Sequence, residues 1–223
     1  MIIDWLHFLS ALLLLWLPRQ ALRWGRTKLR WGGSRRRRLH DTNPAKAHEQ
    51  GDPRVNFRAE IAKLRNHIDF FRAALGSVML LGTFEGIEAA VRVEQAVSTE
   101  AGRLVTMVQV SVLLVGVLIQ VIRYEQRVSL YAPIFYLSGL TVGMCGLYPA
   151  LFSLVLVWAI NLAFLGPGAF LSVHALLVLT FGVLFGGLES RLPFVAAGLL
   201  LLPVGLSLLS RRRLGMFTKR MKA

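Results

Sequence analysis

Seven apolar stretches divide this chain of 223 residues, and they constrain its fold more than any other feature. About 20 residues of α-helix, each rising about 1.5 Å, cross a bilayer core of about 30 Å. The last six stretches therefore predict six membrane-spanning helices in a domain over residues 70–209. The seven stretches cover about residues 2–17, 70–90, 104–122, 130–148, 150–165, 169–188 and 193–209.

Turn residues separate the later stretches and predict how the spans are paired. The segments "YP" at 148, "GPG" at 166–168 and "ESRLP" at 189–193 combine Pro or Gly with polar residues, so they predict tight turns. Six helices joined in this way form a bundle of three hairpins. With 55% hydrophobic and 17% charged residues, the chain is also too apolar for an ordinary soluble domain.

The first stretch, "MIIDWLHFLSALLLLWLP", has the length of a signal-peptide core but differs from one in two respects. Its basic residues follow it, and no small-residue cleavage site is present. We therefore interpret residues 1–18 as an uncleaved anchor with its N-terminus outside and with Trp5 and Trp16 at the interfaces. A helix lying in the interface is the alternative.

The formal net charge of +14 is concentrated at two places. Residues 19–38 hold nine Lys or Arg and no acidic residue, and six more lie between Arg211 and Lys222. Basic loops of membrane proteins remain in the cytoplasm. Six spans lie between the two basic segments, and an even number of crossings places both segments on the same side of the membrane. We therefore predict a cytoplasmic linker over 19–69 and a cytoplasmic tail over 210–223. This bias and the compact loops indicate a bacterial inner membrane.

The linker contains two features that could bind a partner. Its arginine run, Arg35, Arg36, Arg37 and Arg38, lies near Trp24 and Trp31 and is typical of contact with anionic lipid head groups. Nucleic acid is disfavoured as a partner because no stacking platform or nucleic-acid-binding fold is evident. Further along, spacings of 4, 3, 4 and 3 predict an amphipathic helix leading into the second stretch, with Phe57, Ile61, Leu64, Ile68 and Phe71 on one face.

Two carboxylates, Glu85 and Glu88, end the stretch predicted over 70–90. Ionisable residues inside a bilayer are candidates for function by default, because a charge at its centre costs about 2.5 to 3.5 kcal/mol. The favoured interpretation is a helix end at the outer interface, where Arg92, four residues after Glu88, pairs with it. The alternative is an ion or proton site of a transporter or channel, formed with Gln109 at a similar depth.

A second polar layer is predicted near the inner face and contains Gln120, Ser138, Asn161 and His174. Asn161 and His174 flank the "GPG" turn and could hydrogen-bond each other across it, as polar side chains between membrane helices commonly do. That structural role is the favoured account of both residues.

The segment "LSGLTVGMCGL" at 137–147 resembles the serine-bearing helix of rhomboid intramembrane proteases. The resemblance implies a nucleophile at Ser138 and a base at His174, although Tyr136 stands where that family has glycine. Glycines four residues apart also let membrane helices pack closely, and this is the favoured interpretation. The spacing recurs at Gly82 and Gly86, at Gly139 and Gly143, and at Gly182 and Gly186.

The histidines and the single cysteine are scattered, so the sequence predicts no metal site, no cofactor and no catalytic residue set. We therefore expect an all-helical membrane protein that is most simply a non-enzymatic subunit or scaffold. Its basic face would bind anionic lipid or other membrane-protein subunits. The transporter and the rhomboid-like hydrolase remain the alternatives.

Overall fold

The computed structural model describes residues 4–19, 60–83, 100–124, 128–164, 166–211 and 214–215. Within these ranges the chain is mostly helical, and each predicted apolar stretch contains one α-helix. A single 3-10 turn, η1 at Asn161–Ala163, follows the fifth of them. The α-helices are α1 (Trp5–Trp16), α4 (Leu64–Gly82), α6 (Glu100–Val121), α7 (Ile134–Cys145), α8 (Leu147–Ala159), α9 (Pro167–Gly186) and α10 (Leu192–Leu209).

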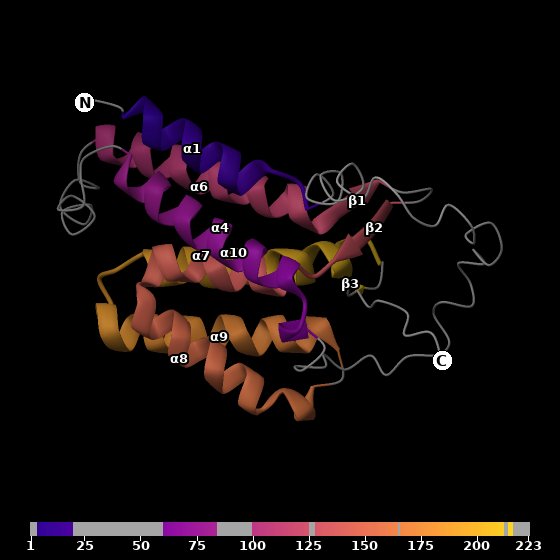
Figure 1. Ribbon diagram of the computed structural model, residues 1–223. Coiled ribbons are helices and arrows are strands. Elements are labelled where there is room, and N and C mark those ends of the chain that lie inside the picture. The colour runs from indigo at the N-terminus through magenta and orange to yellow at the C-terminus, as the bar shows by residue number, and fades with distance from the viewer. Residues whose placement is uncertain are drawn as a thin grey trace.

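Successive helices run in alternating directions through one bundle (Figure 1). The C-terminal ends of α1, α6, α8 and α10 lie at the same end as the N-terminal ends of α4, α7 and α9. At the opposite end, the Asp4 amide donates to the Thr83 carbonyl oxygen at 3.1 Å, which joins the start of α1 to the end of α4. The end of α1, the start of α4, the α6–α7 connection and the end of α10 therefore lie at one end of the bundle, which we call the basic end.

Three helices are long and apolar enough to cross a membrane, over Arg103–Val121, Pro167–Gly186 and Leu192–Leu209. Three of the six predicted spans therefore have the length and composition that a membrane span requires. The others are shorter or more polar than predicted. Helices α7 and α8 have 12 and 13 residues, and α1 has 12.

Several predicted boundaries were wrong. The stretch 130–148 begins in a strand, and its helix ends at Gly146, whose φ of +86° favours glycine. Helix α8 therefore begins at Leu147 and takes Pro149 into its first turn, where a missing amide hydrogen is tolerated. The helix of the second stretch begins at Leu64 and not at residue 70, so it includes much of the predicted amphipathic segment. It ends at Gly82, and residues 84–90 of the predicted span lie outside the described residues.

A small three-stranded sheet at the basic end was not predicted. Strand β1 (Ile122–Tyr124) pairs antiparallel with β2 (Val128–Tyr131), and β2 pairs parallel with β3 (Leu214–Gly215). The Ala132 amide also donates to the Gly215 carbonyl oxygen at 3.0 Å. The sheet thereby ties residues 214–215, which follow α10, to the connection between α6 and α7.

Glycines allow α4 and α7 to pack closely against each other. A Cβ added at Gly139 would lie 2.9 Å from the Ala73 Cβ and closer still to the Phe70 carbonyl oxygen, and one at Gly143 would lie 2.7 Å from the Ser77 Cβ. At Gly182 an added Cβ would lie 2.6 Å from Pro193 of α10. The predicted packing role is confirmed at these three glycines. It fails at Gly82, where no atom of the described residues lies within 4 Å of an added Cβ, and Gly86 lies outside the described residues.

Helix α1 packs against α4 and α6 as part of the bundle (Figure 1). Its Ala11 and Leu15 are fully buried, and Leu15 lies against Gly76 of α4 and Gly116 of α6. The helix begins at Trp5 because the Asp4 carboxylate accepts hydrogen bonds from the amides of Leu6 and His7 at 3.1 and 3.2 Å. The predicted anchor is therefore an integral helix of the fold.

Candidate functional site

Polar side chains converge on the C-terminal end of α1, inside the bundle. A helix of 12 residues is only about 18 Å long, so its last carbonyl groups end among the other helices. Such groups have no partner within their own helix. Here Tyr136 donates to the Leu15 carbonyl oxygen at 3.0 Å and Gln120 to that of Leu17 at 3.0 Å. Side chains from α6 and α7 thus cap α1.

Arg72 of α4 is the third cap, and it is charged. Its guanidinium donates to the carbonyl oxygen of Leu14 at 3.2 Å and to that of Leu17. It also lies over the ring of Tyr136, 5.1 Å from the ring centroid, as a cation–π contact. A positive charge at a helix C-terminus opposes the negative end of the helix dipole. Arg72 therefore stabilises α1 by charge as well as by hydrogen bonding.

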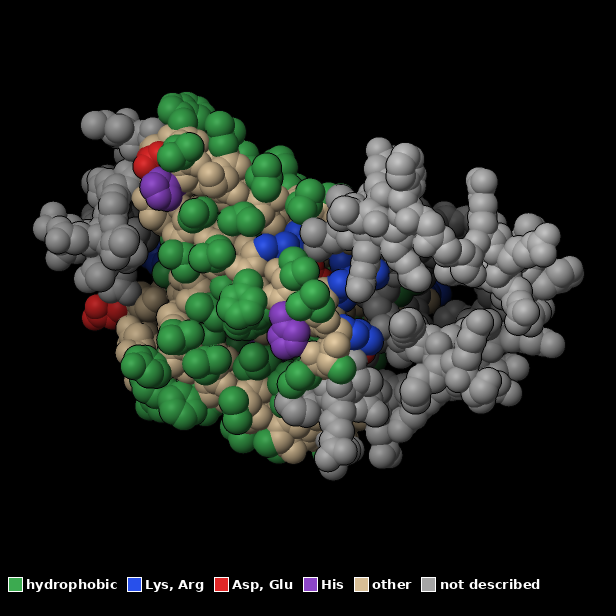
Figure 2. Space-filling model, in the orientation of Figure 1, with side chains coloured by type: hydrophobic (Ala, Val, Ile, Leu, Met, Phe, Trp, Pro, Cys, Tyr) green, Lys and Arg blue, Asp and Glu red, His purple; other side chains and the backbone are tan. Residues whose placement is uncertain are grey.

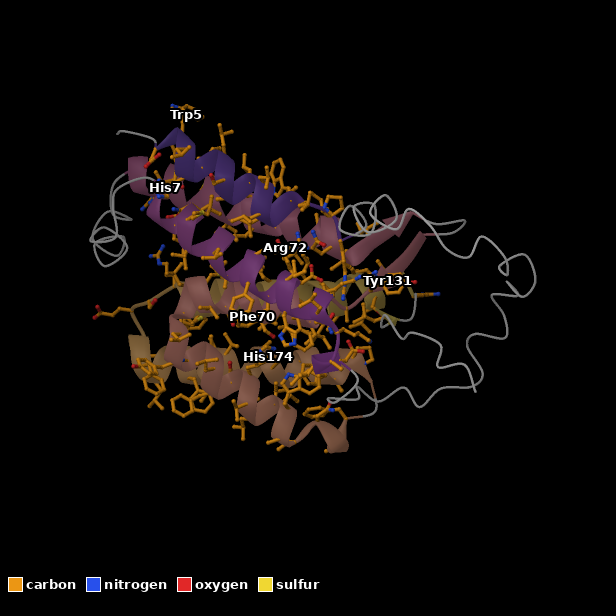
Figure 3. All side chains as sticks on the ribbon, in the orientation of Figure 1. Trp5, His7, Phe70, Arg72, Tyr131 and His174 are labelled. Atoms are coloured by element: carbon orange, nitrogen blue, oxygen red, sulfur yellow. The ribbon has the colours of Figure 1, made fainter. Side chains whose placement is uncertain are left out.

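Asp69 balances this charge by accepting from two arginines. One carboxylate oxygen lies 2.9 Å from Arg72 Nε and the other lies 3.0 Å from Arg19 Nε. Asp69 and Arg72 are only 2% and 5% exposed. Figure 3 shows Arg72 among helices α1, α4 and α6. Two guanidinium groups thus share one buried carboxylate.

The network continues toward the basic end. Arg19 donates to the Asn66 side-chain oxygen, Asn66 donates to a Glu60 carboxylate oxygen at 2.8 Å, and Glu60 pairs with Lys63. We call the six connected side chains the ion cluster; they are Arg19, Glu60, Lys63, Asn66, Asp69 and Arg72. Part of it lines a cavity of about 10 Å³, which has room for about one water molecule.

Electrostatics explain the arrangement of the ion cluster. Burial lowers the pKa of the Arg19 guanidinium, and the adjacent Asp69 carboxylate offsets only part of this shift. The Asp69 and Glu60 carboxylates share the cavity with the first residues of α7, where the free amide groups of a helix N-terminus favour negative charge. Arg72 is only partly satisfied, since its Nη2 has no hydrogen-bond partner among the described residues.

Several residues proposed from the sequence lie outside the described residues. They are Glu85, Glu88, Arg35, Arg36, Arg37, Arg38, Trp24 and Trp31. The third member of the proposed ion or proton site is described. Gln109 is buried, and its amide donates to the carbonyl oxygens of Leu80 and Leu81 at 3.3 and 3.5 Å. It therefore caps the C-terminal end of α4, just before Glu85 and Glu88 in the sequence.

The predicted inner polar layer is not a connected site. Ser138 is buried and donates to the Ile134 carbonyl oxygen of its own helix at 2.9 Å. His174 is fully buried between helices (Figure 3), and neither ring nitrogen has a hydrogen-bond partner within the described ranges. The predicted bond between Asn161 and His174 is therefore absent there. So is the Ser138–His174 pair that the rhomboid resemblance implies.

Sequence reasoning missed the ion cluster, although one signal for it was present. Asp69 and Arg72 are three residues apart, so they share a helical face opposite the apolar stripe formed by Leu64, Ile68 and Phe71. Read as a membrane helix, that pattern indicates a charged face turned inward. The participation of Arg19 had no local signal, because it lies 50 positions from Asp69 in the chain.

The unsatisfied histidine gives a first prediction. Replacing His174 by leucine should raise the free energy of unfolding by about 1 kcal/mol, because it removes two buried polar atoms without partners. The measurement is unfolding by SDS titration in mixed micelles. Gln109→Leu is the matched control and should be destabilising, since it breaks bonds to α4. A loss of stability in His174→Leu would show that the imidazole has a polar partner.

No group of three or more His, Cys, Asp or Glu that could hold a metal ion is found in the part of the chain that the structure describes. Comparisons of the chain with protein-family models, with curated protein sequences and with solved structures found no match.

Proposed function

We propose that this chain is a non-enzymatic, multi-pass subunit or scaffold of a bacterial inner membrane. Its N-terminus would lie outside and its basic end in the cytoplasm, where the arginine run binds anionic lipid head groups or a partner. The observation that carries this proposal is that several buried polar side chains join helices to one another.

Four of the buried polar side chains are bonded to the backbone of another helix. Gln109 caps α4, Gln120 and Tyr136 cap α1, and Arg72 caps α1 while pairing with Asp69. Hydrogen bonds between membrane helices contribute about 0.6 kcal/mol each on average, so several together fix a rigid arrangement. These bonds between helices support a structural role.

The alternation of helix directions supports the proposed orientation. At the basic end, Arg19, Lys63 and Arg211 flank helices and Arg65 lies in the first turn of α4, while the opposite end has Arg103 together with Glu189 and Arg191. The excess of positive charge is therefore at one end among the described residues, as the positive-inside tendency requires for a cytoplasmic face.

Retention of anionic lipid tests the function of the basic face. Replacing Arg35, Arg36, Arg37 and Arg38 by glutamine should reduce the phosphatidylglycerol that remains bound after detergent extraction. Each basic residue near an anionic surface is worth about 1 kcal/mol. The affinity should therefore fall about fivefold for each charge removed. Native mass spectrometry of the extracted protein counts the bound lipids directly.

A control at the opposite end makes this result specific. Arg103→Gln combined with Arg191→Gln removes exposed positive charges there and should leave lipid retention unchanged. If the arginine-run variant retained as much phosphatidylglycerol as the wild type, the lipid-binding role of the basic face would be wrong. A protein partner would then be its remaining candidate ligand.

A further inference from the structure

Helix α4 is amphipathic in the reverse sense to a helix of a soluble protein. Its buried face is polar and includes Asn66, Asp69, Arg72 and Ser77. Its exposed face is apolar, and Leu64, Phe71 and Leu75 are 68%, 61% and 54% exposed. With Ile68 and Val78 these residues follow one another at spacings of 4, 3, 4 and 3. We call these five residues the α4 stripe.

The α4 stripe belongs to a larger apolar surface. In a soluble protein, such a stripe faces the core and the charged face meets water. Here the exposed leucines of α1, Leu6, Leu9 and Leu13, extend the same kind of surface. Figure 2 shows hydrophobic side chains over most of the described surface in this view, with Lys and Arg gathered toward the basic end. Acyl chains are the environment that such a surface fits.

The charges on α4 do not prevent it from entering a bilayer, because the fold shields them. A charged residue at the centre of an isolated membrane helix costs about 2.5 to 3.5 kcal/mol. In the bundle, however, Asp69 pairs with two arginines, and Arg72 also bonds to the carbonyl groups of α1. Neither side chain faces outward. The 19 residues of α4 extend about 28 Å, close to the thickness of a bilayer core.

We propose that α4 crosses the bilayer with the α4 stripe against lipid acyl chains and with Arg72 near the midplane, held by Asp69 and α1. This inference rests on the membrane placement in the proposed function. It adds a span to the three helices that qualify by composition. It also assigns a role to α1, which shields a charge that lipid would not accept.

The proposal predicts the depth of each position. Ala73 is the middle residue of α4, so Phe71 and Leu75 lie about 3 Å from the midplane and Leu64 about 13 Å from it, at 1.5 Å per residue. Because the chain has a single cysteine, Cys145→Ser gives a background for placing one spin label at a time. Labels on the α4 stripe project away from the core.

The experiment measures collisions of each label with oxygen, which concentrates in the bilayer, and with a water-soluble nickel chelate. The full-length protein is reconstituted in phosphatidylcholine and phosphatidylglycerol. Leu64→Cys, Ile68→Cys, Phe71→Cys, Leu75→Cys and Val78→Cys are compared. Oxygen collisions should exceed nickel collisions by the widest margin at 71 and 75. Ser77→Cys, on the buried face, should collide little with either reagent.

Two outcomes would overturn the inference. Strong nickel collisions at 71 and 75 would place the α4 stripe in water, and weak collisions with both reagents along the whole stripe would mean that protein covers it. Leu176→Cys, on the exposed side of the membrane-length helix α9, separates this failure from a failure of the proposed function. Lipid-like collisions at 176 without them at 71 and 75 would refute only the placement of α4.

Discussion

Asp69→Asn should lower the free energy of unfolding by about 3 to 5 kcal/mol, which is the typical result of removing one partner from a buried ion pair. The substitution keeps the size of the side chain but removes the carboxylate charge that pairs with both Arg72 and Arg19. Arg72 is 5% exposed and cannot turn to water without leaving the end of α1. The loss of one negative charge should therefore loosen α1 as well as α4.

Titration with SDS in mixed micelles measures this loss, and protease sensitivity near α1 measures its location. Glu189→Gln is the matched control, because it removes a carboxylate that is exposed at the opposite end of the bundle. It should change the free energy of unfolding by less than about 0.5 kcal/mol. If Asp69→Asn were as mild as this control, water or another anion would have to neutralise the two arginines, and the ion cluster would not be a structural element.

Sequence reasoning predicted the helices best where local chemistry ends them. Pro167 begins α9 at the position where proline is favoured, and Gly187, with a φ of +82°, ends it. The predicted stretches 169–188 and 193–209 therefore differ from α9 and α10 by only a few residues. In these two helices the ends of the apolar run coincide with the residues that begin and end a helix, so the local sequence is enough to predict the helix.

Prediction failed where tertiary contacts set the boundary. Helix α7 is short because its preceding residues pair with β1 and with β3, and β3 comes from the far end of the chain. The ion cluster is also a product of tertiary structure, since Arg19 and Asp69 meet only when α1 and α4 are packed side by side. Periodicity within one helix shows which face is polar. It does not show which distant residue neutralises that face.

Gly139→Ala should lower the free energy of unfolding by about 3 kcal/mol, the upper part of the usual range for overpacking. The added Cβ would lie 2.9 Å from the Ala73 Cβ and closer still to the Phe70 carbonyl oxygen, so α4 would have to move. Intrinsic helix propensity predicts the opposite sign, because alanine is favoured over glycine by about 1 kcal/mol in a helix. The sign of the effect therefore separates helix packing from helix propensity.

Gly198→Ala is the control for this test, because no atom in the described part of the chain lies within 4 Å of a Cβ at that position in α10. Unfolding by SDS should show it to be neutral or slightly stabilising. A stabilising Gly139→Ala would mean that α4 and α7 are farther apart than the structure has them.

Moving α4 would also move Asp69 and Arg72, which are on the same helix as Phe70 and Ala73. The close packing at Gly139 and the neutralisation of charge at the end of α1 thus both depend on where α4 lies in the bundle.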